Sequence, residues 1–176
     1  MKPPDLNSEI KFYPNLDSFQ KSNKKKAASK TGDYEDFFER SGNLKMSKYM
    51  TFTDTAFKDR ECLLNALSEC GYLETEEGEA LSLYGYRGDR RPETAQIVVR
   101  RKFIGSASND LGFQKTENGY VPVISEYDRS FMMQGKFLTN LRTNYNLKSA
   151  EKLARNLRGT LSRERVGSTI KIRIKY

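Results

Sequence analysis

The hydrophobic pattern changes period between residues 51 and 72, where alternating apolar and polar positions give way to a helical spacing. The alternation predicts a half-buried strand that starts at Thr51, and the helical spacing predicts an amphipathic helix over residues 59–70. Gly71 follows as a typical helix stop. A strand followed by a helix of this kind indicates an α+β domain. The apolar stripe of the predicted helix consists of Leu63, Leu64, Leu67 and Cys70.

The middle of the chain returns to alternation and predicts a meander of antiparallel strands. Residues 74–79 carry four glutamates and indicate a solvated bend with Gly78 in a turn. Asn118-Gly119 lies between two apolar runs and is the strongest short signal for a β-hairpin. Strands are therefore expected at residues 81–86, 95–104, 111–114 and 120–124.

From Phe131 the spacing becomes helical again, with Met133, Phe137, Leu138, Leu141 and Tyr145 on one face. A second helix is expected to begin near Ser149 and to end at Gly159. Residues 161–166 and 169–176 then predict a terminal hairpin, whose last strand directs isoleucines to the core and basic residues outward. The predicted fold is α+β: an antiparallel sheet of five to seven strands, covered mainly on one face by two to three helices.

The first 46 residues show no sustained hydrophobic period and are predicted to form an extended or disordered extension to a single domain of residues 47–176. Aromatic residues are gathered in two islands of this polar extension. A few buried rings can offset the ordering entropy of a docking segment, so these residues are candidates for binding a partner. Alternatively, they pack on their own domain. They are Phe12, Tyr13, Phe19, Tyr34, Phe37 and Phe38.

The net charge of +8 is distributed unevenly. Residues 47–128 carry 10 Lys and Arg against 14 Asp and Glu, whereas residues 129–176 carry 12 against 2. The basic C-terminal quarter could bind an acidic protein surface or nucleic acid, or it could simply be a solvated face. The candidate residues are Lys148, Lys152, Arg155 and Arg158 on the predicted helix and Lys171, Arg173 and Lys175 on the last strand.

Few features of the sequence point to catalysis, a cofactor or a metal. The chain has no histidine, the commonest general base and a frequent zinc ligand. Cys62 and Cys70 lie on the same predicted helix and are expected to be packing residues rather than a disulfide or a metal site. Carboxylates such as Asp54, Asp89 and Asp128 are available, but their spacing brings no two of them together. No apolar run of about 18 residues predicts a membrane span.

The order of elements from residue 46 to residue 176 resembles the hypothetical chloroplast open reading frame thirty-five family, an uncharacterised group from algal plastids and cyanobacteria. The resemblance runs through Met46-Ser-Lys-Tyr, Lys58-Asp-Arg-Glu-Cys-Leu-Leu-Asn-Ala-Leu with Gly71-Tyr72, Leu83-Tyr-Gly-Tyr-Arg-Gly, Ala95-Gln-Ile-Val-Val-Arg, Leu111-Gly-Phe with Asn118-Gly-Tyr, Phe137-Leu through Tyr145, and Ile170-Lys-Ile. It departs at residues 1–46, an addition to the usual family start, and at Ser125-Glu-Tyr-Asp-Arg-Ser, where many relatives are acidic and aromatic. It implies a plastid stroma or a cyanobacterial cytoplasm and no catalytic residues.

These observations favour a non-catalytic interaction or assembly protein that binds a larger protein complex in a photosynthetic setting. The alternative is a protein that binds nucleic acid, RNA in particular, through the basic C-terminal helix and hairpin. Against this alternative, the outward face of the last strand has no aromatic residues on which bases could stack.

Overall fold

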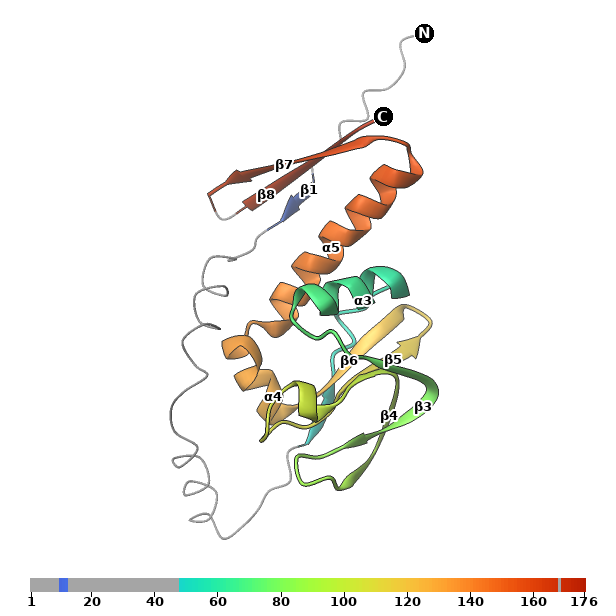
Figure 1. The fold of residues 1–176 in the computed structure, drawn as a ribbon, viewed down its shortest axis with the longest axis vertical. Coiled ribbons are helices and arrows are strands. Elements are labelled where there is room, and N and C mark those ends of the chain that lie inside the picture. The colour runs from blue at the N-terminus through green and yellow to red at the C-terminus, as the bar shows by residue number, and fades with distance from the viewer. Residues whose placement is uncertain (1–9, 13–47, 168) are drawn as a thin grey trace. The chain divides into compact units, whose positions relative to one another are not determined.

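The computed structural model describes residues 10–12, 48–167 and 169–176 (Figure 1). These residues form an α+β fold with two antiparallel sheets, which confirms the predicted fold class. The strands are β1 (Ile10–Phe12), β2 (Tyr49–Thr51), β3 (Glu76–Tyr84), β4 (Arg90–Val99), β5 (Leu111–Thr116), β6 (Gly119–Ser125), β7 (Thr160–Val166) and β8 (Thr169–Lys175). The helices are α3 (Arg60–Glu69), α4 (Glu126–Phe131) and α5 (Phe137–Asn156), with 3₁₀ turns at η1 (Arg101–Phe103) and η2 (Met132–Gly135).

The larger sheet has the strand order β2-β6-β5-β4-β3. Strands β3 to β6 follow one another as hairpins, and β2 joins the sheet antiparallel to β6. The Asn118-Gly119 turn closes the β5–β6 hairpin, and Gly119 has a φ of 118°, in the left-handed region that favours glycine. The meander and this hairpin were predicted correctly from the sequence.

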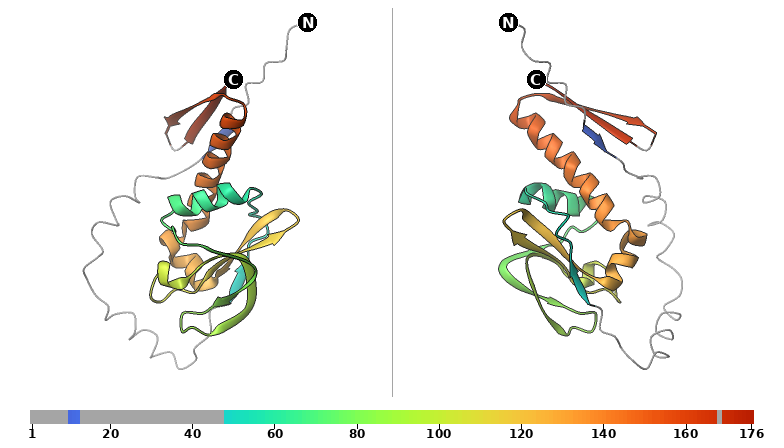
Figure 2. Two further views of the ribbon diagram at one scale, coloured as in Figure 1. Left: turned by 45° about the vertical axis from the view of Figure 1, so that its right-hand side comes forward. Right: turned by 180° about the vertical axis from the view of Figure 1, so that it is seen from behind.

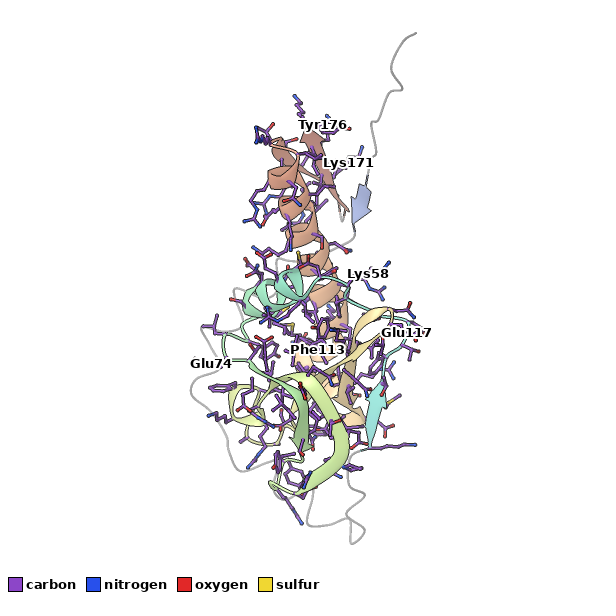
Figure 3. All side chains as sticks on the ribbon, turned by 90° about the vertical axis from the view of Figure 1, so that its right-hand side faces the viewer. Lys58, Glu74, Phe113, Glu117, Lys171 and Tyr176 are labelled. Atoms are coloured by element: carbon purple, nitrogen blue, oxygen red, sulfur yellow. The ribbon has the colours of Figure 1, made fainter. Side chains whose placement is uncertain are left out.

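The helices cover one face of the larger sheet, as Figure 2 shows for α3 and α5. Phe113 of β5 is fully buried there, and Phe57 lies between it and Tyr145 of α5 with edge-to-face ring contacts. Figure 3 labels Phe113 within this core. The buried cluster also includes Leu63 and Leu67 of α3. The main core therefore lies between the helices and one face of the larger sheet, as the sequence predicted.

A second, smaller core lies on the opposite face of the same sheet. It consists of Tyr49, Leu83, Ala95, Val98 and Val123. Gly112 allows this face to close, since a Cβ at that position would lie only 2.9 Å from the Cβ of Ala95. The larger sheet therefore buries apolar side chains on both of its faces.

The α3 helix begins and ends as predicted. The Asp59 side chain accepts a hydrogen bond from the Cys62 N–H at 2.9 Å, which satisfies a donor that the first turn leaves unpaired. Gly71, just after the helix, has a φ of 92°, which is readily adopted only by glycine.

Five predicted boundaries were wrong. The strand predicted at residues 95–104 is β4, which ends at Val99 and is followed by the 3₁₀ turn η1. The helix expected from Phe131 begins as α5 only at Phe137, and Met133 lies in η2 before it. The strand predicted to start at Thr51 instead ends there, and the acidic bend of residues 74–79 is largely the first half of β3, with Gly78 inside the strand. Register shifts in the β3–β4 pair accommodate that glycine. The predicted helix break near Ser149 does not exist, because no glycine or proline interrupts α5 between Phe137 and Asn156.

The terminal hairpin forms as predicted, but it belongs to a separate three-stranded sheet with the order β1-β8-β7. β1 pairs antiparallel with β8, with Ile10 opposite Ile172 and Phe12 opposite Ile170. Ile172 is 4% exposed, and both β7 and β8 contact α5. Two sheets thus replace the single sheet of up to seven strands that the sequence suggested.

None of the helices in the described part of the chain is both long and apolar enough to cross a membrane.

Candidate interaction surface

Two of the predicted basic residues are engaged in ion pairs between α5 and α3. The Lys152 Nζ lies 2.6 Å from Asp59 Oδ2 and 2.8 Å from Glu61 Oε2. The Lys148 Nζ lies 2.7 Å from Glu69 Oε1 and 3.6 Å from Glu151 Oε2. The hydrogen bond to Asp59 raises the pKa of Lys152, and the hydrogen bond to Glu69 raises that of Lys148. These two lysines therefore hold helices together rather than contribute uncompensated charge.

The remaining predicted cations gather at the end of α5 and on the three-stranded sheet β1-β8-β7, which we call the C-terminal sheet. Arg155, Arg158, Arg173 and Lys175 are exposed, and no ion pair engages them among the residues that the structure describes. Arg158 lies beyond the helix, with a φ of 52°, so its predicted place on the helical face was wrong. Figure 3 labels Lys171 on this sheet.

Two further arginines of this surface, Arg163 and Arg165 on β7, were missed from the sequence. Both are exposed. In the β7–β8 register Arg163 lies opposite Ile172 and Arg165 opposite Ile170. The two-residue spacing of Arg163 and Arg165 in the predicted strand already indicated that they share a face. In a hairpin, that face is shared with their cross-strand partners.

The register divides the basic residues between the two faces of the hairpin. Lys171, Arg173 and Lys175 alternate with the isoleucines and so lie on the face that carries Glu164, Ser162 and Thr160 of β7. Arg163 and Arg165 lie on the isoleucine face. We call the face with Lys171, Arg173 and Lys175 the lysine face. On the described strands β7 and β8, this face contains no aromatic residue. A positive charge is thus available on both sides of this hairpin.

A shallow groove of about 480 Å³ lies where α3, α5 and the start of β7 meet. Most of its charged groups already compensate one another through the ion pairs of Lys148 and Lys152. Arg155 is the exception, and it borders the basic surface. The groove residues are Glu61, Cys62, Asn65, Lys148, Glu151, Ala154, Arg155, Gly159 and Leu161.

The three carboxylates considered for catalysis, Asp54, Asp89 and Asp128, do not form one cluster in the described residues. Asp128 is buried and accepts hydrogen bonds from Asn109 and Ser125. Asp89 lies 2.8 Å from the Nε of Arg91. Within the described residues no hydrogen bond joins any two of Asp54, Asp89 and Asp128, and no group of three or more Cys, Asp or Glu residues could hold a metal. Asp128 and Asp89 therefore take part in packing and in loop structure.

A buried polar network around Asn109 and Asp110 was not predicted. The Asp110 carboxylate accepts hydrogen bonds from the Tyr84 N–H at 3.0 Å and from Arg100 Nη1 at 2.8 Å. The Tyr49 hydroxyl donates to the Asp110 carbonyl at 2.8 Å, and burial, reinforced by the Asp110 charge, raises the pKa of Tyr49. The partners come from distant parts of the sequence, so no local pattern revealed them.

Both cysteines are free and buried, with Cys62 2% and Cys70 3% exposed. Their prediction as unbridged packing residues is confirmed. Burial raises the pKa of the Cys70 thiol from 9.0 to about 11.

The candidate docking residues of the extension are mostly outside the described part of the chain. Phe12 lies in β1, whose backbone pairs with β8. Tyr13, Phe19, Tyr34, Phe37 and Phe38 lie outside the described residues.

Comparison with known families gives a match to the C-terminal two thirds of the chain. The sequence model of a family described as a protein of unknown function (DUF1257) matches residues 66–174, which is more than half of the chain and includes the basic hairpin. Neither the curated proteins nor the solved structures contain a significant match.

Proposed function

Because the chain belongs to the DUF1257 family of proteins of unknown function, we propose its role from its surface: a non-catalytic interaction protein that binds an acidic face of a larger protein complex. The binding surface is the basic patch formed by the end of α5 and the β7–β8 hairpin. We refer to it as the basic patch; it comprises Arg155, Arg158, Arg163, Arg165, Lys171, Arg173 and Lys175.

The observation that carries this proposal is the local excess of positive charge. Residues 155–176 contain these seven cations and a single acidic residue, Glu164. By contrast, the cations of α5 that face α3 are compensated there. A surface with an excess of charge of one sign accelerates association with a surface of the opposite sign and penalises partners of the same sign.

A protein partner is favoured over nucleic acid by the composition of the patch. The lysine face of the hairpin has no aromatic residue among its described positions, so it offers no platform for stacked bases. Glu164, opposite Lys171 in the register, would also lie against any phosphate backbone that followed this face. RNA remains the second candidate, and the test below separates the two.

The setting of the proposal rests on the sequence resemblance to the chloroplast open reading frame thirty-five family. We place the protein in the plastid stroma or in the cyanobacterial cytoplasm on that basis. The aromatic residues Tyr34, Phe37 and Phe38 of the extension are proposed to anchor the same partner complex.

The test replaces Arg173 and Lys175 by glutamate in the full-length chain. Tagged protein is used to recover partners from a lysate of photosynthetic cells, with and without nuclease. We expect a defined protein complex that survives nuclease, and we expect the double variant to lose at least about 90% of it, because two reversed charges remove attraction and add repulsion. Lys58→Glu, an exposed lysine far from the patch in sequence, is the matched control and should retain the complex.

Two outcomes would contradict the proposal. Retention of the complex by the double variant would exclude the basic patch as its binding site. Recovery of RNA, with loss of all partners after nuclease and a steep decline in recovery as salt rises, would assign the patch to nucleic acid instead.

A further inference from the structure

Among the described residues, β7 forms one edge of its sheet and has a strand on one side only. β7 pairs with β8 in one continuous register of seven residue pairs, and no described strand pairs with its other side. The other sheet edges are protected, because β1 and β2 have three residues each and the β3–β4 pair contains two register shifts. β7 is therefore the longest regular open edge in the described residues.

The hairpin geometry determines which backbone groups of β7 point outward. Two residues separate Val166 from Thr169, and in such a hairpin the pair next to the turn exchanges both of its hydrogen bonds. Bonded and non-bonded pairs then alternate along the strand. Ser162 and Glu164 consequently bond to β8, whereas the N–H and C=O groups of Leu161 and Arg163 point away from it.

The side chains of the β7 residues whose backbone groups point away from β8 determine which side chains an added strand would place opposite them. Leu161, Arg163 and Arg165 lie on one face, since their partners on β8 are the isoleucines 174, 172 and 170. Leu161 is half-buried beside the groove, and Arg163 is exposed. Directly opposed residues of an antiparallel pair are stabilised by opposite charges and by apolar contact. An antiparallel strand that fits this edge has, in order, an acidic residue opposite Arg165, any residue, an acidic residue opposite Arg163, any residue, and an apolar residue opposite Leu161.

We propose that the β7 edge binds an extended acidic segment of the partner as a fourth, antiparallel strand of the C-terminal sheet. This inference rests on the proposed function and specifies how the acidic partner is held. The backbone of Leu161 and Arg163 supplies the pairing groups, and the arginines select the acidic side chains. A second copy of β7 fits poorly, because antiparallel pairing centred on Arg163 or Glu164 places arginine opposite arginine.

The first experiment follows amide hydrogen exchange of the full-length chain by NMR, with the peptide Thr-Glu-Thr-Glu-Thr-Val-Thr as the probe. We expect the N–H groups of Leu161 and Arg163 to exchange at least about fivefold more slowly with the peptide, the effect of one hydrogen bond. The N–H groups of Ser162 and Glu164 should be protected with or without it. N-methylation of the two Glu residues and the Val of the peptide should abolish binding, whereas N-methylation of the Thr residues at the third, fifth and seventh peptide positions should not.

The second experiment compares two variants at one outward position. Arg163→Pro removes an outward N–H but keeps every β7–β8 hydrogen bond, and proline is tolerated at such edge positions. Arg163→Gln removes the same charge and keeps the N–H. We expect Arg163→Pro to raise the peptide Kd at least roughly fivefold above that of Arg163→Gln.

Equal binding of the two N-methylated peptides, or equal Kd values of the two variants, would overturn strand pairing. The loss of the complex in the Arg173 and Lys175 double variant could still hold in that case, so the proposed function would stand. Protection of Leu161 and Arg163 without peptide, together with a dimer in sedimentation, would likewise overturn the inference in favour of a second copy.

Discussion

Asp110 fixes the loop between β4 and β5 through both oxygens of its carboxylate and through its carbonyl. It is 2% exposed, and it accepts hydrogen bonds from the backbone N–H groups of Tyr84 and Arg101 and from the Arg100 guanidinium. A buried carboxylate is tolerated only when hydrogen bonds and a counter-ion replace its hydration. This residue therefore links β3, the loop and β2 into one arrangement.

We expect Asp110→Ala to lower the free energy of unfolding by about 3 kcal/mol, because it leaves buried donors and a partly buried arginine without their acceptor. Urea unfolding of the variant and the parent chain measures this difference. Asp54→Ala, at an exposed turn, is the control and should change stability by no more than about 0.5 kcal/mol. A loss below about 1 kcal/mol for Asp110→Ala would contradict the role assigned to the network.

At the residue scale, the sequence could identify local devices but not distant partners. The Asp59 cap, the Gly71 stop and the Asn118-Gly119 turn depend on neighbours within a few residues, so their patterns are visible in the sequence. Lys152 was read as an exposed cation because its partner Asp59 lies 93 residues away. Only the fold shows which charges are compensated.

At the scale of elements, the connection between α4 and α5 carries backbone strain. Met133 and Gln134 both adopt left-handed dihedral angles, with φ values of 51° and 57°, and Gly135 follows with a φ of 76°. A left-handed conformation costs a residue with a side chain about 1–2 kcal/mol. Glycine at position 135 avoids that cost, whereas its two predecessors do not.

We expect Gln134→Gly to raise the free energy of unfolding by roughly 0.5–1 kcal/mol, since relief of the left-handed strain exceeds the added entropy of the unfolded chain. Gln134 is exposed, so little packing is lost. Gln114→Gly, at an exposed position of β5, is the matched control and should lower stability by up to about 1 kcal/mol. Destabilisation by both substitutions in chemical unfolding would argue against strain at this connection.

Elements were predicted well where one signal dominated and poorly where signals competed. The β5–β6 and β7–β8 hairpins combine alternation with turn residues, and both formed as expected. Gly78 and four glutamates suggested a bend, yet pairing with β4 extends β3 across this segment. Ser149 suggested a new helix start, but continuous hydrogen bonding through α5 prevailed over that local preference.

At the scale of the whole molecule, the Cys70 thiol and the Tyr72 hydroxyl are expected to make the free energy of unfolding sensitive to high pH. Burial raises the pKa of Cys70 to about 11 and that of Tyr72 to about 12. The unfolded chain loses these protons at lower pH than the folded chain does. The stability that they contribute is therefore complete below about pH 9 and is lost as the pH rises through their folded pKa values.

We expect the free energy of unfolding to fall by about 2 kcal/mol or more between pH 9 and pH 11, and we expect this fall to be smaller in Cys70→Ala. Urea unfolding at pH 8, pH 9.5 and pH 11 measures both slopes. Cys70→Ala lowers stability at every pH through lost packing, so only the slope is diagnostic. Equal slopes for the two chains would remove Cys70 as a source of the alkaline sensitivity.

The pairing of β1 with β8 has a consequence for how the protein is made. Ile10 and Ile172 are neighbours across the C-terminal sheet although almost the whole chain separates them. A ribosome that adds roughly 5–20 residues per second delivers β8 many seconds after β1. The larger sheet, whose last strand is β6, has all of its residues well before that. The surface proposed to receive a partner is therefore completed only after the larger sheet, so a nascent chain that has been made only as far as β6 does not yet carry it.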